Sequence, residues 1–235
     1  LMAPWGPANG AAAAPAVVTV AGDVAPDNAF TILDKAFGKF AAAELPKIER
    51  VALPTGTRAI SLGVPVAQSQ LGYVVAAPGP HDDGYLATRI LLYTLAHHYE
   101  GRFGKEAISR RGLAYYVDAR YTSNGGPGFV TLGIGVDTHK LDALAALLAA
   151  ELERLGKEPP TTAEIEEAKQ HLVGRAMSAA QGNDELATEL ATNWLWHGDL
   201  PSVERLRERL DAVTREDVLA VIPGFVNGLT ITVAP

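Results

Sequence analysis

Apolar and polar positions follow two different periods along this chain, and both periods recur. Short β-branched or alternating runs predict strands at 16–21, 57–62, 68–76, 113–122, 129–136 and 229–233. Apolar residues at steps of three and four predict helices from Asp27, at 82–99, 140–155, 161–182 and 184–196, and after Thr214. The chain therefore mixes strands and helices without strict alternation between them.

The order of these elements narrows the fold class. The turn sequence SNGGPG at 123–128 joins two predicted strands as a hairpin. Hairpin-joined strands exclude a strictly alternating βαβ sheet, and no glycine-rich phosphate loop follows Val20. We therefore predict an α+β fold, in which one mostly antiparallel sheet has helices packed on one side.

Local signals also predict helix starts and buried faces. Asp27 is the expected N-cap of the first helix, and Thr161 with Glu164 forms a capping box; Thr214 with Asp217 caps the last helix. Four residues should bury one side of the first helix: Phe30, Leu33, Phe37 and Phe40. Four more should bury one side of the 82–99 helix: Tyr85, Leu91, Leu92 and Leu95.

Composition bounds the class of protein. The chain has 235 residues, of which 48% are hydrophobic, and it has no cysteine, so disulfides and thiolate metal sites are excluded. A net charge of −7 argues against a nucleic-acid partner, and no apolar stretch is long enough to predict a membrane span. We expect a flexible segment at 1–15 and a single domain at 16–235. The location remains open between cytoplasm and periplasm.

Two histidine-containing motifs are candidates for a metal site. His97 and Glu100 fit the start of the inverted zincin motif His-x-x-Glu-His, but Gly101 stands where the second histidine ligand belongs. The run His81-Asp82-Asp83 reads as a loop with acids at a helix start, or as part of a dispersed site in an unrelated α+β enzyme. We therefore predict no metal ligands and no catalytic residues in this chain.

The segment 102–120 is basic within an acidic protein. It contains five of the 20 basic residues: Arg102, Lys105, Arg110, Arg111 and Arg120. Such a segment is either a solvated helix followed by a strand, or a positive surface for an anionic or carbonyl-rich ligand such as a peptide.

Four segments in order carry a family resemblance. The stretch GRFGKEAISRRGLAYYVDARY at 101–121 resembles SRLFQEIREKRGLAYSV of the insulinase/pitrilysin family of inverted-zincin metallopeptidases, which includes the mitochondrial processing peptidase. VVTVAGDV at 17–24, a helix ending in Phe37-Gly38, and TTAEIEEAKQHLVGR at 161–175 are similar to further family segments. The resemblance covers roughly 17–233 and implies the family's C-terminal, non-catalytic domain.

The resemblance also implies a role. In this family two similar halves close around an extended peptide; zinc is held by one half, while an Arg and a Tyr seven residues apart in the other hold the substrate. The Tyr position falls on Tyr115, but the Arg position falls on Ile108, so Arg110 or Arg111 would have to substitute. The implied partners are an extended peptide and a catalytic zinc-binding half or subunit. The resemblance also implies assembly as a homodimer or a heterodimer.

Strand alternation competes with this assignment. Alternation places Tyr115 with Leu113 and Val117 on an apolar face, and it makes Tyr116 the exposed residue. Tyr115, Tyr116, Arg110 and Arg111 are therefore the candidate substrate-binding residues, with Tyr115 first and Tyr116 as its rival. The alternative function is a degenerate scaffold subunit with a structural role only, which the Ile108 departure permits.

Overall fold

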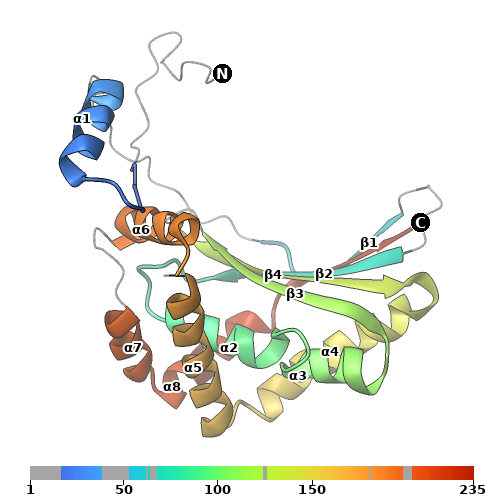
Figure 1. Ribbon diagram of the computed structural model, residues 1–235. Helices are drawn as coiled ribbons and strands as arrows, with labels where there is room; N and C mark the ends of the chain where they lie inside the picture. Colours follow the sequence, from blue (N-terminus) through green and yellow to red (C-terminus); the bar gives the residue numbers. More distant parts are fainter. Residues whose placement is uncertain are drawn as a thin grey trace. The chain divides into compact units, whose positions relative to one another are not determined.

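The computed structural model describes residues 17–38, 53–61, 63, 68–123, 126–179, 181–197 and 203–235 (Figure 1). The predicted flexible segment 1–15 lies outside these residues. The chain divides into two compact units. Unit 1 comprises 1–48 and 177–201, and unit 2 comprises 49–176 and 202–235.

Unit 2 is built on a five-stranded sheet with the order β1-β5-β2-β4-β3. The strands are β1 (Gly56–Ser61), β2 (Gln68–Ala77), β3 (Ala114–Ser123), β4 (Gly128–Asp137) and β5 (Leu229–Ala234). Only the β1–β5 pair is parallel, and the other three pairs are antiparallel. The predicted mostly antiparallel sheet is confirmed, and these strands lie within two residues of their predicted bounds.

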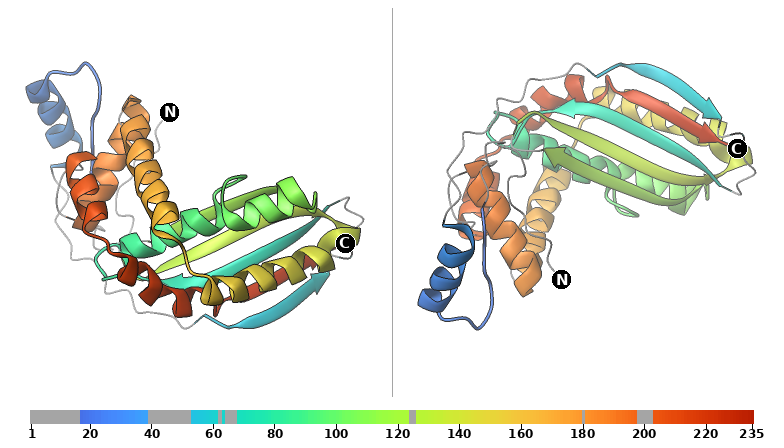
Figure 2. Two further views of the ribbon diagram at one scale, coloured as in Figure 1. Left: turned by 90° about the horizontal axis from the view of Figure 1, so that it is seen from below. Right: turned by 90° about the horizontal axis from the view of Figure 1, so that it is seen from above.

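The helices of unit 2 lie on one face of this sheet, as the two views in Figure 2 show. They are α2 (Tyr85–Ala96), α3 (Arg102–Gly104), the π-helix η1 (Lys105–Arg110), the 3₁₀-helix η2 (Thr138–Lys140), α4 (Leu141–Lys157), α7 (Val203–Asp211), α8 (Arg215–Phe225) and most of α5 (Thr162–Ala179). The predicted α+β class with helices on one side is therefore confirmed.

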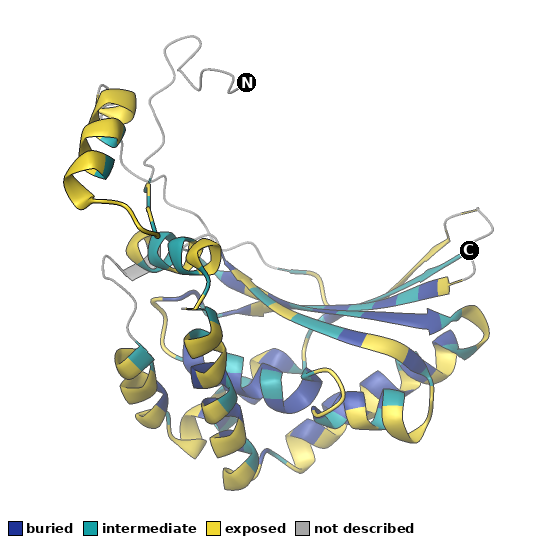
Figure 3. Ribbon diagram, in the orientation of Figure 1, coloured by how far each residue is buried: buried dark blue, intermediate teal, exposed yellow. Residues whose placement is uncertain are grey.

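The core lies between the sheet and these helices (Figure 3). In β2, Leu71, Tyr73 and Val75 alternate with less buried residues and face the helices. The residues predicted to bury one side of the second helix are all buried: Tyr85, Leu91, Leu92 and Leu95. Tyr73 also ties the chain before β5 to the core, because its hydroxyl donates to the Phe225 carbonyl at 2.5 Å and accepts from the Gly228 N–H at 2.9 Å.

Both predicted capping boxes of unit 2 are present. Thr161 Oγ1 accepts from the Glu164 N–H at 3.3 Å, and the Glu164 carboxylate accepts from the Thr161 N–H at 2.9 Å. Thr214 and Asp217 make the same reciprocal bonds at the start of α8. These short-range contacts depend on residues three apart, which is why the sequence predicts them.

Within the basic segment, residues 102–110 are helical and β3 follows them, which matches the interpretation of 102–120 as a helix followed by a strand. Gly104 permits the helix to pack against the preceding loop, because a Cβ at this position would lie 1.6 Å from the His98 carbonyl oxygen. His98 itself has a positive φ of 37°. This close packing arises from tertiary contact and leaves no periodic pattern in the sequence.

Unit 1 contains α1 (Pro26–Phe37) and α6 (Asn183–His197), and here two predictions are wrong. Residues 17–21 of the predicted first strand form no strand; Thr19 instead donates its hydroxyl to the Ala187 carbonyl at 2.7 Å. A run of β-branched residues forms a strand only where a neighbouring strand provides backbone hydrogen-bond partners.

The first helix also differs from its prediction. It begins at Pro26 with Ala25 as its N-cap, so Asp27 lies inside the first turn, where its charge suits the helix dipole. No α1 residue is buried, and Phe30 and Phe37 are exposed, so the predicted buried face is wrong for the described residues. Phe40 lies outside them.

Candidate functional site

The candidate site is centred on a β-bulge near the start of β3. Ala114 pairs with Val136 and Tyr116 pairs with Gly135, so Tyr115 is an extra residue with no partner in β4. A bulge of this kind shifts the register by one and turns the following side chains to the other face. The hairpin's regular pairing from Ser123 back to Tyr116 ends here.

The bulge leaves both candidate tyrosines exposed. Tyr115 is 49% exposed and Tyr116 is 43% exposed, while Ala114 and Val117 on either side are buried. The alternation that places Tyr115 on the apolar face is therefore wrong, because it assumes an unbroken strand. The two candidate phenols are exposed together.

A chain of polar contacts holds Tyr115. Its hydroxyl donates a short hydrogen bond to Asp137 Oδ1, at the end of β4. Lys140 Nζ lies 3.1 Å from Asp137 Oδ2 and also donates to the Gly112 carbonyl at 3.1 Å. The hydrogen bond to Asp137 raises the pKa of Tyr115, and the bonds from Tyr115 and then Lys140 lower the pKa of Asp137. The phenol therefore stays protonated and the carboxylate stays charged.

Tyr116 lies on the second face of the sheet, opposite the helices of unit 2. Its ring covers Gly135, where a Cβ would come within 2.5 Å of Tyr116 Cε1. Its hydroxyl donates to Gln70 Oε1 of β2 at 3.0 Å. Gly135 thus provides the space that lets this ring lie flat across two neighbouring strands.

The two candidate arginines stand at the end of η1 and share one acid. Arg110 Nη1 lies 2.5 Å from Glu106 Oε1, and Arg111 Nε lies 3.5 Å from Glu106 Oε2. Both guanidinium groups are mostly exposed, so each keeps N–H donors facing solvent. Ile108, which occupies the family's Arg position, is partly buried and packs against the core.

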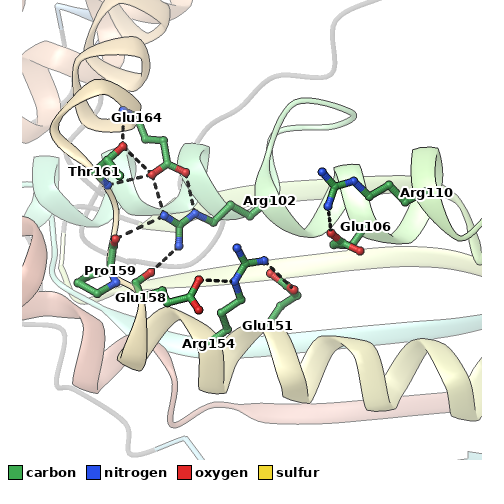
Figure 4. A network of polar contacts seen from close by, with 9 residues as sticks. All are labelled: Arg102, Glu106, Arg110, Glu151, Arg154, Glu158, Pro159, Thr161 and Glu164. Carbon is green, nitrogen blue, oxygen red and sulfur yellow. Dashed lines mark hydrogen bonds and ion pairs between the residues drawn. The ribbon is translucent and has the colours of Figure 1, made fainter.

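The wider basic segment is largely neutralised by acids. Arg102 makes a bidentate ion pair with Glu164, with both N–O distances at 2.7 Å, and it donates to the Glu158 carbonyl at 2.6 Å (Figure 4). Arg120 pairs with Asp118 at 2.8 Å. The interpretation of 102–120 as one continuous positive surface is therefore not supported at these arginines.

The histidines form a ring cluster and not a donor set for zinc. His97 stacks on Tyr93 with ring centroids 4.5 Å apart, and His171 of α5 lies 4.3 Å from His97. Across the described residues, no group of three or more His, Asp or Glu side chains is placed to hold a metal. His97 and Glu100 contribute only two donors, 3.7 Å apart, so they do not fit the family's zinc site.

The second histidine motif stands in a turn. Asp82 Oδ2 accepts from the Gly79 N–H at 2.9 Å, which closes the loop before α2. This bond matches the loop interpretation of His81-Asp82-Asp83.

The sequence does not single out Asp137, Lys140 or Gln70 as site residues. The hairpin turn at 123–128 is the sequence signal that could have found Asp137. Pairing the two strands residue by residue outward from this turn places the start of β3 beside the end of β4. Without the bulge, that count places Tyr115 opposite Val136 and hides its contact with Asp137.

Fold and site together define a class: an α+β half-unit that presents exposed tyrosines and whose described residues hold no zinc donor set. The chain belongs to the family described as the peptidase M16 inactive domain, which matches residues 12–172. The resemblance to the non-catalytic domain of the insulinase/pitrilysin metallopeptidases is therefore confirmed, and with it a non-catalytic role.

Solved structures share this fold. A peptidase M16 inactive domain from Pseudomonas fluorescens has a TM-score of 0.76 at 20% identity, covering 91% of this chain and 52% of that one. A Helicobacter pylori protease has a TM-score of 0.73 at 18% identity, covering 92% and 54%. This chain thus spans about half the length of both.

No curated protein sequence matches this chain. Among the described residues, no helix is long and apolar enough to cross a membrane.

Proposed function

We propose that this chain is the substrate-binding, chamber-closing half of an M16 zinc metallopeptidase, with residues 16–235 acting as one domain. It would pair with a catalytic, zinc-holding half or subunit of the same family, in a homodimer or a heterodimer. Water attack on the peptide bond would take place in that partner. This chain would contribute orientation of an extended peptide and no bond breaking.

One observation carries the proposal: the bulge exposes the phenols of Tyr115 and Tyr116 side by side in sequence. Exposed aromatic residues with polar tips are well suited to bind an extended main chain, since they combine apolar area with hydrogen bonding. Arg110 and Arg111 would supply N–H donors to peptide carbonyls in place of the Arg that Ile108 replaces.

The test is peptide binding by the chain alone. We expect fluorescein-labelled casein peptides to bind the chain in an anisotropy titration. The double substitution Y115F/Y116F should weaken binding about tenfold, in line with the loss of two hydrogen bonds. The control is Y99F, which removes another exposed phenol, outside the site. Equal affinity of the double variant and the wild type would contradict the proposal.

The scaffold alternative rests on Ile108, which cannot donate a hydrogen bond from its side chain. The two functions separate in a complex reconstituted with the catalytic half. The Y115F variant should slow peptide turnover while assembly, followed by size-exclusion chromatography, stays intact. Unchanged turnover in an intact complex would favour the scaffold.

A further inference from the structure

A polar clamp closes around the bulge and holds Tyr115 in place. The clamp consists of the Tyr115 hydroxyl, the Asp137 carboxylate, the Lys140 ammonium and the Gly112 carbonyl, joined in that order. It connects the two ends of the β3–β4 hairpin: Gly112 lies three residues before Tyr115, and Lys140 lies three residues after Asp137. The segment that enters β3 is thus tied to the segment that leaves β4.

The clamp restrains Tyr115, which the bulge leaves without a partner residue in β4. A bulged residue has lost its ladder partner, so its side chain is free to sample several rotamers. The hydrogen bond to Asp137 selects one of them, and Asp137 is itself fixed by Lys140. The Asp137 side chain makes no capping hydrogen bond to η2, so its carboxylate is available for the contacts with Tyr115 and Lys140.

The clamp also decides which hydrogen bond Tyr115 can offer to a ligand. A phenol has one proton to donate, and Asp137 takes it, so only the oxygen lone pairs of Tyr115 remain to accept. Tyr116 is in the same state because its proton goes to Gln70. The matching group on a peptide is an amide N–H, while the exposed guanidinium donors of Arg110 match its carbonyls.

Building on the proposed function, we propose that Asp137 is a positioning residue that orients Tyr115 as a hydrogen-bond acceptor for an amide N–H of an extended peptide. Asp137 acts through Tyr115 and does not itself touch the peptide. Its effect on peptide binding therefore exists only while the Tyr115 hydroxyl is present.

A double-mutant cycle tests this dependence with the fluorescein-labelled casein peptides. We expect D137A and Y115F each to weaken binding about three- to tenfold, and the D137A/Y115F double variant to bind no worse than Y115F. D137N keeps an acceptor oxygen and should recover part of the affinity. The control is D118A, because Asp118 is a similarly exposed acid of β3 that pairs with Arg120 instead.

A titration by NMR of the Tyr115 ring carbon Cζ separates the possible failures. D137A should return the pKa of Tyr115 towards the ordinary value of 10.0, and D118A should leave it raised. If D137A lowers this pKa but leaves affinity unchanged while Y115F reduces it, positioning is overturned and the proposed function survives. If Y115F leaves affinity unchanged while Y115F/Y116F reduces it, Tyr116 carries the binding, so positioning is overturned and the proposed function survives. If neither variant changes affinity, the proposed function fails together with the inference. Additive losses in the double variant would also overturn the positioning role.

Discussion

Arg102 and Glu164 form a bidentate ion pair that joins α3 to the start of α5 across 62 residues of sequence. The arginine side chain is only 14% exposed, and it also bonds the Glu158 carbonyl. The same carboxylate accepts from the Thr161 N–H in the capping box. A single guanidinium therefore fixes both the start of α5 and the loop that precedes it, as Figure 4 shows.

Removing this arginine should destabilise unit 2. We expect R102Q to lower the free energy of unfolding by about 2 kcal/mol at neutral pH, because Glu164 keeps its charge but loses two charge-assisted bonds. Urea denaturation measures the change. The control R154Q removes a more exposed arginine, paired with Glu151 and Glu158, and should cost less than about 1 kcal/mol. Equal losses would show that the Arg102 pair is no stronger than a surface pair.

The same pair predicts an acid dependence. The hydrogen bond from Arg102 is the main cause that lowers the pKa of Glu164 from 4.5 to about 2. A lowered carboxyl pKa stabilises the fold above pH 4.5, and this contribution is lost as the pH falls from 4.5 towards 2. The wild-type free energy of unfolding should fall across this window more steeply than that of R102Q. Parallel curves would contradict the assignment.

The histidine cluster predicts a second pH dependence, nearer neutrality. Burial is the main cause that lowers the pKa values of His97 and His171; the charge of His98 lowers that of His97 further, and the charge of His97 lowers that of His171 further. The charged groups that face the pair are His98, Glu100, Glu167 and Arg175. The histidines of the unfolded chain therefore bind protons at a higher pH than those of the folded chain. The free energy of unfolding should fall as the pH drops below 6.5.

Substitution tests the assignment of this dependence to the ring cluster. In urea denaturation at pH values above and below 6.5, H97Q/H171Q should show a smaller loss of stability on acidification than the wild type. The control H139Q replaces an exposed histidine of η2 and should keep the full loss. If H97Q/H171Q keeps the wild-type slope, the cluster is not its source.

Metal analysis checks the non-catalytic role. We expect the purified chain to hold well below one zinc per chain, because His97 and Glu100 lack further donors among the described residues. Incubation with zinc followed by dialysis and mass spectrometry measures the content, and H97Q should not change it. One tightly held zinc per chain would contradict the prediction.

Most of the unit 2 fold could be predicted from sequence because its signals are local. The hairpin turn, the two capping boxes and the buried side of α2 each depend on residues a few positions apart. Tertiary contact decides the rest. The close packing of α3 needs Gly104 against the His98 carbonyl, and the described residues give 17–21 no strand partner.

The site shows the same division. Its tyrosines follow from the family resemblance, but their exposure depends on the bulge, which a simple period of two cannot represent. Alternation buries Tyr115, whereas one extra residue in β3 exposes it and brings its hydroxyl to Asp137. The register of a strand pair is a property of both strands, so neither strand alone predicts it.

Gly135 offers the sharpest test of the surface beneath Tyr116. A Cβ at position 135 would lie 2.5 Å from Tyr116 Cε1, so G135A must push the ring aside and break its bond to Gln70. We expect G135A to lower the free energy of unfolding by about 1–3 kcal/mol, measured by urea denaturation, and to weaken peptide binding as Y116F does. The control G133A lies two residues earlier in β4, where a Cβ meets nothing within 4 Å, and it should leave both unchanged. Equal effects of the two substitutions would mean that the loss comes from the glycine backbone and not from the Tyr116 ring.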